Sequence, residues 1–158
     1  MDNFSMHVSG VDNVVKYLEA QVARLDEASR KIVEKGGLII ANHAKDEFKG
    51  SGTADNNYPN PTFRTGNLRN SIKVLDVRRE ALGTWSSKTG PTKMYGRRVE
   101  LGFSGTVNGY TAKRGGTTYT VGSYQATSRA FPYLAPGFEK SRGELQELYS
   151  YEWRKALS

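Results

Sequence analysis

The amino-acid sequence predicts an α+β fold: a small antiparallel-rich sheet packed by a long N-terminal helix and a C-terminal helix, with a protruding hairpin. Apolar residues recur at helical spacing near both ends of the chain, and short strand-like runs separated by turns lie between them. One pair of these runs is polar and flanks two glycines. Since the chain has 158 residues, about the size of one ordinary domain, we expect residues 1–158 to form a single domain.

Residues 11–48 have the apolar spacing of one long amphipathic helix. Asp12 suits its first turn, where a carboxylate complements the helix dipole. The Gly36-Gly37 pair interrupts the pattern, so either the helix kinks there or another backbone packs closely against it. The rest of the chain is too short to cover this helix at both ends, and we expect part of its apolar stripe to meet another subunit. The stripe consists of Val11, Val15, Leu18, Val22, Leu25, Ile32 and Ile39.

Residues 49–64 are rich in Gly, Asn and Pro, and we expect a loop there. Thr65 then suits the N-cap of a short helical turn that carries Leu68 inward. The sheet region is expected to span residues 65–134, with an insert at 103–129.

The first strand is predicted at Ile72–Val77. Its alternation breaks between Val74 and Leu75, which indicates a bulge or a strand buried on both faces. A second strand is predicted over residues 81–88, anchored by Trp85.

Residues 95–101 are ambiguous between helix and strand. Within the insert, two Thr- and Tyr-rich runs flank Gly115-Gly116, which predicts an extended hairpin arm, and we expect this arm to contact a neighbouring subunit or an adjoining assembly. Residues 136–156 read as the C-terminal helix, with Pro136 in its first turn. Its apolar stripe is expected to comprise Phe138, Leu145, Leu148, Tyr149 and Trp153.

Few residues offer catalytic or metal-binding chemistry. The chain has no cysteine and only two histidines. His43 and Glu47 share a helix face, as do Glu144 and Glu147, but such spacing is common on solvated helices, and we expect solvent-facing polar residues. No catalytic elbow, phosphate loop or zinc spacing is present, so we expect no enzyme activity, metal or cofactor. The apolar runs are too short to span a bilayer, and we expect no membrane partner.

The formal net charge is +7, with the basic residues scattered along the chain. Such a charge favours either a solvated or subunit-contact surface, or a basic nucleic-acid-binding protein that contacts DNA directly. Direct phosphate contacts would make DNA affinity fall steeply with salt, which distinguishes the two.

Three short motifs follow one another along the chain: TGNLRNSI at 65–72, YGRRVELG at 95–102 and AFPYLAPG at 130–137. They resemble T-G-x-L-R-x-S-I, Y-A-x-x-[VI]-E-x-G-T and A-x-P-F-L-x-P-A of the HK97-type phage tail-component family, the head–tail joining or tail completion proteins. Gly96 stands where that family usually has Ala, and the segment between the second and third motifs is longer here. The motif scaffold comprises Thr65, Gly66, Leu68, Arg69, Ser71, Ile72, Tyr95, Glu100, Gly102, Pro132, Leu134 and Pro136.

The resemblance implies a virion structural protein without enzyme activity. It would form a homo-oligomeric ring, generally a hexamer, at the head-proximal end of the tail. Its other partners would be the head connector or stopper protein and the tail tube or tail terminator protein. DNA would pass through the lumen without sequence-specific binding. The protein would be made in the host bacterial cytoplasm and reside at the head–tail interface of the virion.

The motifs also have a purely structural interpretation. Glu100 is expected to form an exposed ion pair with Arg97 or Arg98, and Leu68, Ile72, Val99, Leu134 and Phe138 are expected to be buried together. Since a dense basic lining would hold DNA, we expect the lumen to be neutral or acidic and the basic residues to face neighbours or solvent. Candidate subunit contacts are Arg78, Arg79, Arg97, Arg98, Tyr110, Lys113, Arg114 and Tyr119.

Overall fold

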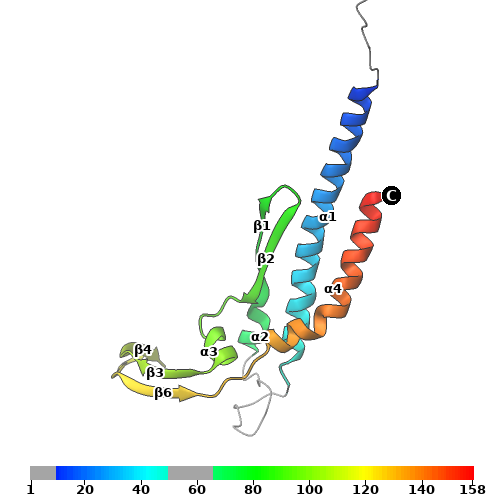
Figure 1. The fold of residues 1–158 in the computed structure, drawn as a ribbon. Coiled ribbons are helices and arrows are strands. Elements are labelled where there is room, and N and C mark those ends of the chain that lie inside the picture. The colour runs from blue at the N-terminus through cyan, green and yellow to red at the C-terminus, as the bar shows by residue number, and fades with distance from the viewer. Residues whose placement is uncertain (1–9, 50–65) are drawn as a thin grey trace, which may run out of the picture.

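The computed structural model describes residues 10–49 and 66–158 (Figure 1). It is a mixed fold of helices and small antiparallel sheets, as the sequence predicts. The elements are α1 (Val11–Asp46), α2 (Asn67–Ser71), β1 (Ile72–Ala81), β2 (Thr84–Pro91), α3 (Gly96–Leu101), β3 (Phe103–Val107), β4 (Tyr110–Arg114), β5 (Thr117–Val121), β6 (Tyr124–Ser128) and α4 (Leu134–Leu157).

The long helix α1 is the axis of the molecule. α4 runs antiparallel along one side of it, and the β1–β2 hairpin packs on another side (Figure 1). α4 ends part-way along α1, so the first turns of α1 extend beyond both neighbours (Figure 1). Both predicted long helices are therefore confirmed, although α1 ends at Asp46 and α4 begins at Leu134, two residues before Pro136.

Two glycines in the middle of α1 let its neighbours approach closely. A Cβ atom on Gly36 would lie 3.0 Å from a methyl carbon of Leu145 in α4. A Cβ atom on Gly37 would lie 2.9 Å from a methyl carbon of Val74 in β1. The helix runs through both positions, so close packing is the alternative that the structure shows, although side chains rather than a backbone make the approach.

The core lies where the C-terminal end of α1 meets α2, β1 and the start of α4. The rings of Phe48 and Tyr133 lie 4.9 Å apart between centroids at its centre. Phe138 was expected in this core but is 43% exposed, because it lies beside rather than on the face of α4 that packs against α1. The buried members are Ala41, Ala44, Phe48, Leu68, Ile72 and Tyr133. The prediction is therefore confirmed for Leu68 and Ile72, whereas Val99 and Leu134 are partly buried and pack against this core.

The β1–β2 hairpin contains the predicted irregularity. Its register shifts between Val74 and Asp76, so the break in alternation is a β-bulge. β2 begins at Thr84 rather than at residue 81, because Leu82 and Gly83 form the turn and Gly83 adopts a φ of 73° that favours glycine. The ambiguous segment over 95–101 is helical, as α3.

The predicted loop over 49–64 falls outside the described residues except for Lys49, and so does Thr65. The short helix expected after Thr65 is present as α2 and buries Leu68. Its N-cap residue is Gly66, with a φ of 69°, rather than Thr65.

Candidate assembly surfaces

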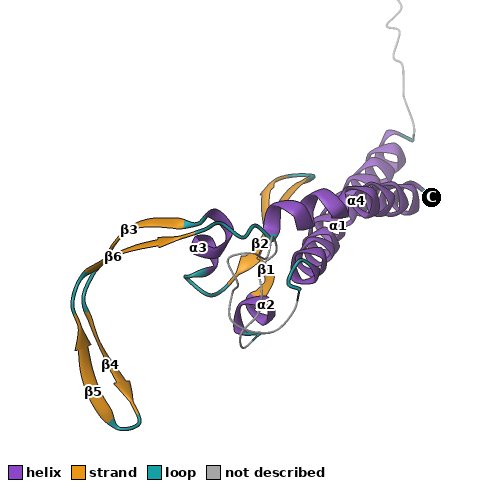
Figure 2. Ribbon diagram, turned by 90° about the horizontal axis from the view of Figure 1, so that it is seen from below, coloured by secondary structure: helices purple, strands orange, loops and turns teal. Residues whose placement is uncertain are grey.

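Residues 103–128, here called the arm, form two consecutive antiparallel ribbons. β3 pairs with β6, and β4 pairs with β5 around the Gly115-Gly116 turn, which confirms the hairpin predicted there (Figure 2). The arm bends between the ribbons (Figure 2). At this bend a Cβ atom on Gly109 would lie 2.9 Å from the carbonyl oxygen of Val121, so only glycine lets the two strands approach this closely.

Each ribbon has one mainly apolar face, on which Ser128 of the first ribbon and Thr117 of the second also lie, and one polar face. Residues directly opposite each other in an antiparallel pair share a face, as do alternate residues along a strand. The register therefore groups the apolar side chains of the first ribbon, which are Phe103, Val107, Tyr124 and Ala126. In the second ribbon it groups Tyr110, Ala112, Tyr119 and Val121. The opposite faces carry Ser104, Thr106, Gln125 and Thr127, and Thr111, Lys113, Thr118 and Thr120.

The apolar faces of the arm are partly uncovered in the part of the chain that the structure describes: Tyr110, Tyr119 and Tyr124 are exposed, and the other apolar members are half-buried. The root of the arm contacts the body, where the Arg98 guanidinium lies 4.3 Å from the centroid of the Phe103 ring. Beyond the root the arm projects away from the helices (Figure 2). An isolated two-stranded hairpin is marginally stable in water, so this arrangement favours a binding partner for the arm.

A second uncovered apolar surface lies on the first turns of α1. The apolar stripe predicted for this helix divides where α4 ends (Figure 1). Its later members Leu25, Ile32 and Ile39 are half-buried. Its first four members are at least 44% exposed: Val11, Val15, Leu18 and Val22. The exposure of one helix end is thus as expected, and its contact with another subunit stays a prediction.

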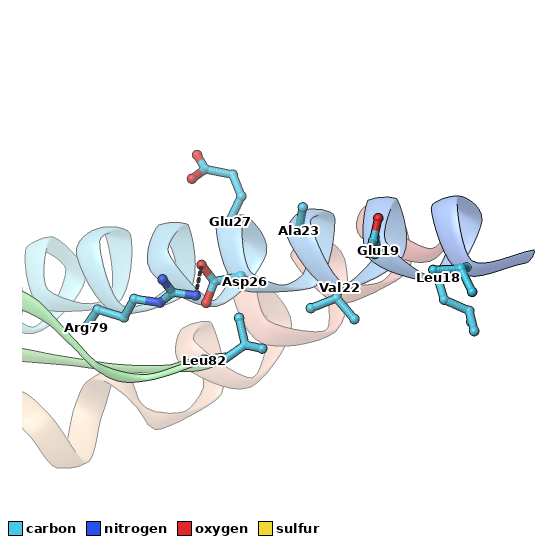
Figure 3. A pocket seen from close by; sticks show the side chains of 9 residues that line it. Leu18, Glu19, Val22, Ala23, Asp26, Glu27, Arg79 and Leu82 are labelled. Carbon is cyan, nitrogen blue, oxygen red and sulfur yellow. Dashed lines mark ion pairs between the residues drawn. The ribbon is translucent and has the colours of Figure 1, made fainter. Parts of the chain in front are cut away.

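These turns and the tip of the β1–β2 hairpin enclose a groove, here called the α1 groove (Figure 3). Leu82, in the hairpin turn, faces the helix across it (Figure 3). The sequence pattern does not identify Leu82 as a groove residue. The one feature that could have indicated it is a large apolar side chain in a turn, where polar residues are usual. The lining is apolar with an acidic margin: Val15, Leu18, Val22, Ala23 and Leu82, with Glu19, Asp26, Glu27 and Arg79.

Asp26 holds the hairpin tip against α1. Its Oδ1 accepts hydrogen bonds from the backbone N–H of Gly83, at 2.8 Å, and from Nε1 of Trp85, at 3.1 Å. Its Oδ2 lies 3.2 Å from the guanidinium of Arg79 (Figure 3). The hydrogen bond from Gly83 is the main cause that lowers the pKa of Asp26 below its ordinary value, and Trp85 and Arg79 act in the same direction.

Asp26→Asn is expected to make the free energy of unfolding depend less on pH in the acid range. Because the pKa of Asp26 is lowered by folding, its contribution is fully present above about pH 5 and is lost as the pH falls through the lowered value. The difference in unfolding free energy between wild type and variant should therefore shrink below about pH 4. Urea titrations from pH 2 to 7 measure it, with Asp12→Asn at the exposed start of α1 as control. A difference that is constant with pH would contradict the assignment.

Glu100 joins the second sequence motif to the third. Its Oε2 accepts hydrogen bonds from the backbone N–H groups of Tyr133 and Leu134, at 2.7 and 2.9 Å, and its Oε1 from that of Ala135, at 3.1 Å. The carboxylate thus caps the N-terminus of α4 from a distant helix, where it satisfies orphan donors and complements the dipole. The expected exposed pair of Glu100 with Arg97 or Arg98 is wrong, because these backbone donors occupy the carboxylate.

Glu100→Ala is expected to lower the free energy of unfolding by about 1–3 kcal/mol, because it leaves charge-assisted hydrogen bonds at a helix terminus unmade. Glu139→Ala is the matched control: Glu139 lies on α4 but pairs only with exposed Arg142 among the described contacts. It should change stability by less than about 0.5 kcal/mol. Urea unfolding followed by tryptophan fluorescence compares the two. Equal effects would contradict the capping role.

The predicted subunit-contact residues do not form one patch. Arg78 pairs with Glu80 at 2.6 Å and Arg79 with Asp26, both within the chain. Tyr110 and Tyr119 lie on the apolar face of the arm, as a contact role requires. The remaining candidates lie in different places. Arg97 lines a pocket beside α3, and Arg98 contacts the ring of Phe103. Lys113 lies on the polar face of the arm, and the side chain of Arg114 is not among those that the structure describes.

Three of the four residues considered for catalysis have side-chain partners among the described contacts, and Glu144 and Glu147 are exposed, as expected. His43 contacts Glu144, with 2.8 Å between Nε2 and Oε1, and Glu47 is buried and paired with Lys140 of α4. The expected solvent-facing His43–Glu47 pair is therefore wrong, because α4 covers this face of α1. Among the described residues no group of three His, Asp or Glu is placed to hold a metal ion. No helix in the same ranges has the length and apolar content to cross a membrane.

Comparison with known proteins adds no relative: no family model matches the chain, and no significant similarity to a curated protein or a solved structure is found.

Proposed function

We propose that this chain is a non-enzymatic structural protein of a tailed-phage virion. It forms a ring, a hexamer in the simplest case, at the head-proximal end of the tail, completes the tail and joins it to the head connector. DNA passes through the lumen of the ring.

The observation that carries this proposal is the pair of uncovered apolar surfaces on opposite projections of one small molecule. Large exposed apolar patches mark interaction sites, and here they lie on two different structures, the arm and the first turns of α1. Two different surfaces that bind each other make a heterologous contact, which closes into a ring when the rotation is right. The three motif resemblances supply the virion setting.

The test is the mass of the purified chain over a range of concentrations, together with electron micrographs of the particles. We expect one closed species with a central hole. A chain that stays monomeric, alone and with connector or tail tube protein, would reject the proposal.

Direct DNA binding is the second candidate function. It is favoured by the arm, which with Arg129 carries three basic residues and no Asp or Glu over 103–129, and which exposes tyrosines able to stack on bases. This candidate predicts that duplex or single-stranded DNA binds with an affinity that falls steeply with salt. Anisotropy measured at several salt concentrations distinguishes it from the ring protein, whose DNA affinity should be weak.

A further inference from the structure

We propose that the arm of one subunit lies in the α1 groove of a second copy of this chain, with its apolar face on the exposed first turns of α1. The proposal rests on the proposed ring and names the two surfaces that make its repeating contact.

In the structure the arm does not lie in the α1 groove of its own chain, because it projects away from α1 (Figures 1 and 2). The arm leaves the body near the C-terminal end of α1, whereas the groove lies toward the other end of this helix (Figures 1 and 3). A helix of 36 residues is about 54 Å long. The arm of a second copy is an occupant that the arm of the same chain does not replace, and such a contact would cover the partly exposed apolar face of the arm.

The two surfaces match in length. Each ribbon of the arm has five-residue strands, about 17 Å long. The exposed stretch of α1 from Val11 to Val22 spans about 18 Å. One ribbon can therefore cover the whole exposed stretch.

The two surfaces also match in charge. The arm carries Lys113 and Arg114 and no carboxylate, with Lys113 on its polar face. The first turns of α1 over residues 11–27 carry four carboxylates against two basic residues, and three of those carboxylates line the groove together with Arg79. Asp26 pairs with Arg79 and Glu27 with Arg30, so Glu19 is the groove carboxylate that no described ion pair neutralises. An acidic apolar groove repels a nucleic acid and accepts a basic amphipathic ribbon, which favours the arm of a second copy as the occupant.

Paired cysteines test this contact, because the wild-type chain has none. One preparation carries Leu18→Cys in the groove, and the second carries Ala112→Cys on the apolar face of the arm. The control for the second is Thr111→Cys, on the opposite face of the same strand. The preparations are mixed and oxidised with oxidised glutathione, and the disulfide-linked heterodimer is quantified by mass.

We expect at least ten times more heterodimer from Leu18→Cys with Ala112→Cys than from Leu18→Cys with Thr111→Cys. Glu19→Lys added to the Leu18→Cys chain should reduce that yield several-fold, since it reverses charge at the groove.

No heterodimer, equal yields from the two arm positions, or a linked homodimer of Leu18→Cys alone would overturn the inference. Oligomers of defined mass without the heterodimer would reject this contact and leave the ring in place. Failure of the ring itself is read separately, from the mass of the unmodified chain.

Discussion

Gly137→Ala is expected to destabilise the protein by about 1–3 kcal/mol, because it over-packs the contact between α4 and α1. A Cβ atom at this position would lie 2.6 Å from the backbone nitrogen of Ala44 and 2.7 Å from its Cα. Neither atom can rotate aside as a side chain does. The two helices must separate at the core, where Ala44 and Tyr133 are fully buried.

Gly143→Ala, in the same helix, is the matched control with the opposite sign. A Cβ atom there meets nothing within 4 Å, so the change only improves helix propensity. It should stabilise the protein by about 0.5–1 kcal/mol. Urea unfolding of both variants measures the difference. A stabilising Gly137→Ala, or two changes of equal size and sign, would contradict the close contact of α1 with α4.

Deletion of Tyr110–Val121 is expected to abolish assembly while the body stays folded. The deletion joins Gly109 to Gly122, which already lie side by side, since a Cβ atom on Gly109 would be 3.4 Å from the carbonyl carbon of Gly122. A four-residue loop, Asn108-Gly109-Gly122-Ser123, then closes the β3–β6 ribbon. The removed ribbon contributes nothing to the buried core, so the free energy of unfolding should change by less than about 0.5 kcal/mol.

The control for this deletion is Thr118→Ala with Thr120→Ala, which alters only the polar face of the same ribbon. Sedimentation and thermal unfolding of the deletion and control variants give assembly and stability together. Wild-type assembly by the deletion variant would contradict a contact role for the ribbon. Loss of the folded body would show that the ribbon belongs to the core.

The helical spacing of apolar residues located both long helices, and the Gly115-Gly116 pair located the arm. The faces of α4 could not be predicted as well. Its buried residues include Gly137, Ser141 and Glu152, and Glu152 pairs with Lys35 of α1. A helix face made of small and charged residues does not stand out in the hydrophobic pattern. The pattern therefore predicted a buried face that includes Phe138 and Tyr149, which are exposed in the structure.

Side-chain roles were harder to predict than elements. Glu100 lies beside two arginines in the sequence, and the structure uses it to cap a helix that starts more than thirty residues later. Arg79 is expected to contact a neighbour, which stays a prediction, and its ion pair with Asp26 of α1 is a partner that the sequence did not reveal. Such long-range partners follow from the packing of α3 and the β1–β2 hairpin, which no local spacing specifies. The α1 groove depends on the same packing.

Electron microscopy of the neck of a virion that carries this chain tests the proposed role most directly. We predict a ring of copies at the head-proximal end of the tail, with each arm lying along the first turns of α1 in a neighbouring copy. The basic side chains should face neighbours or solvent, and the lumen should be neutral or acidic. A neck without this chain, or a lumen lined by Arg78, Arg79, Arg97 and Arg98, would contradict that role.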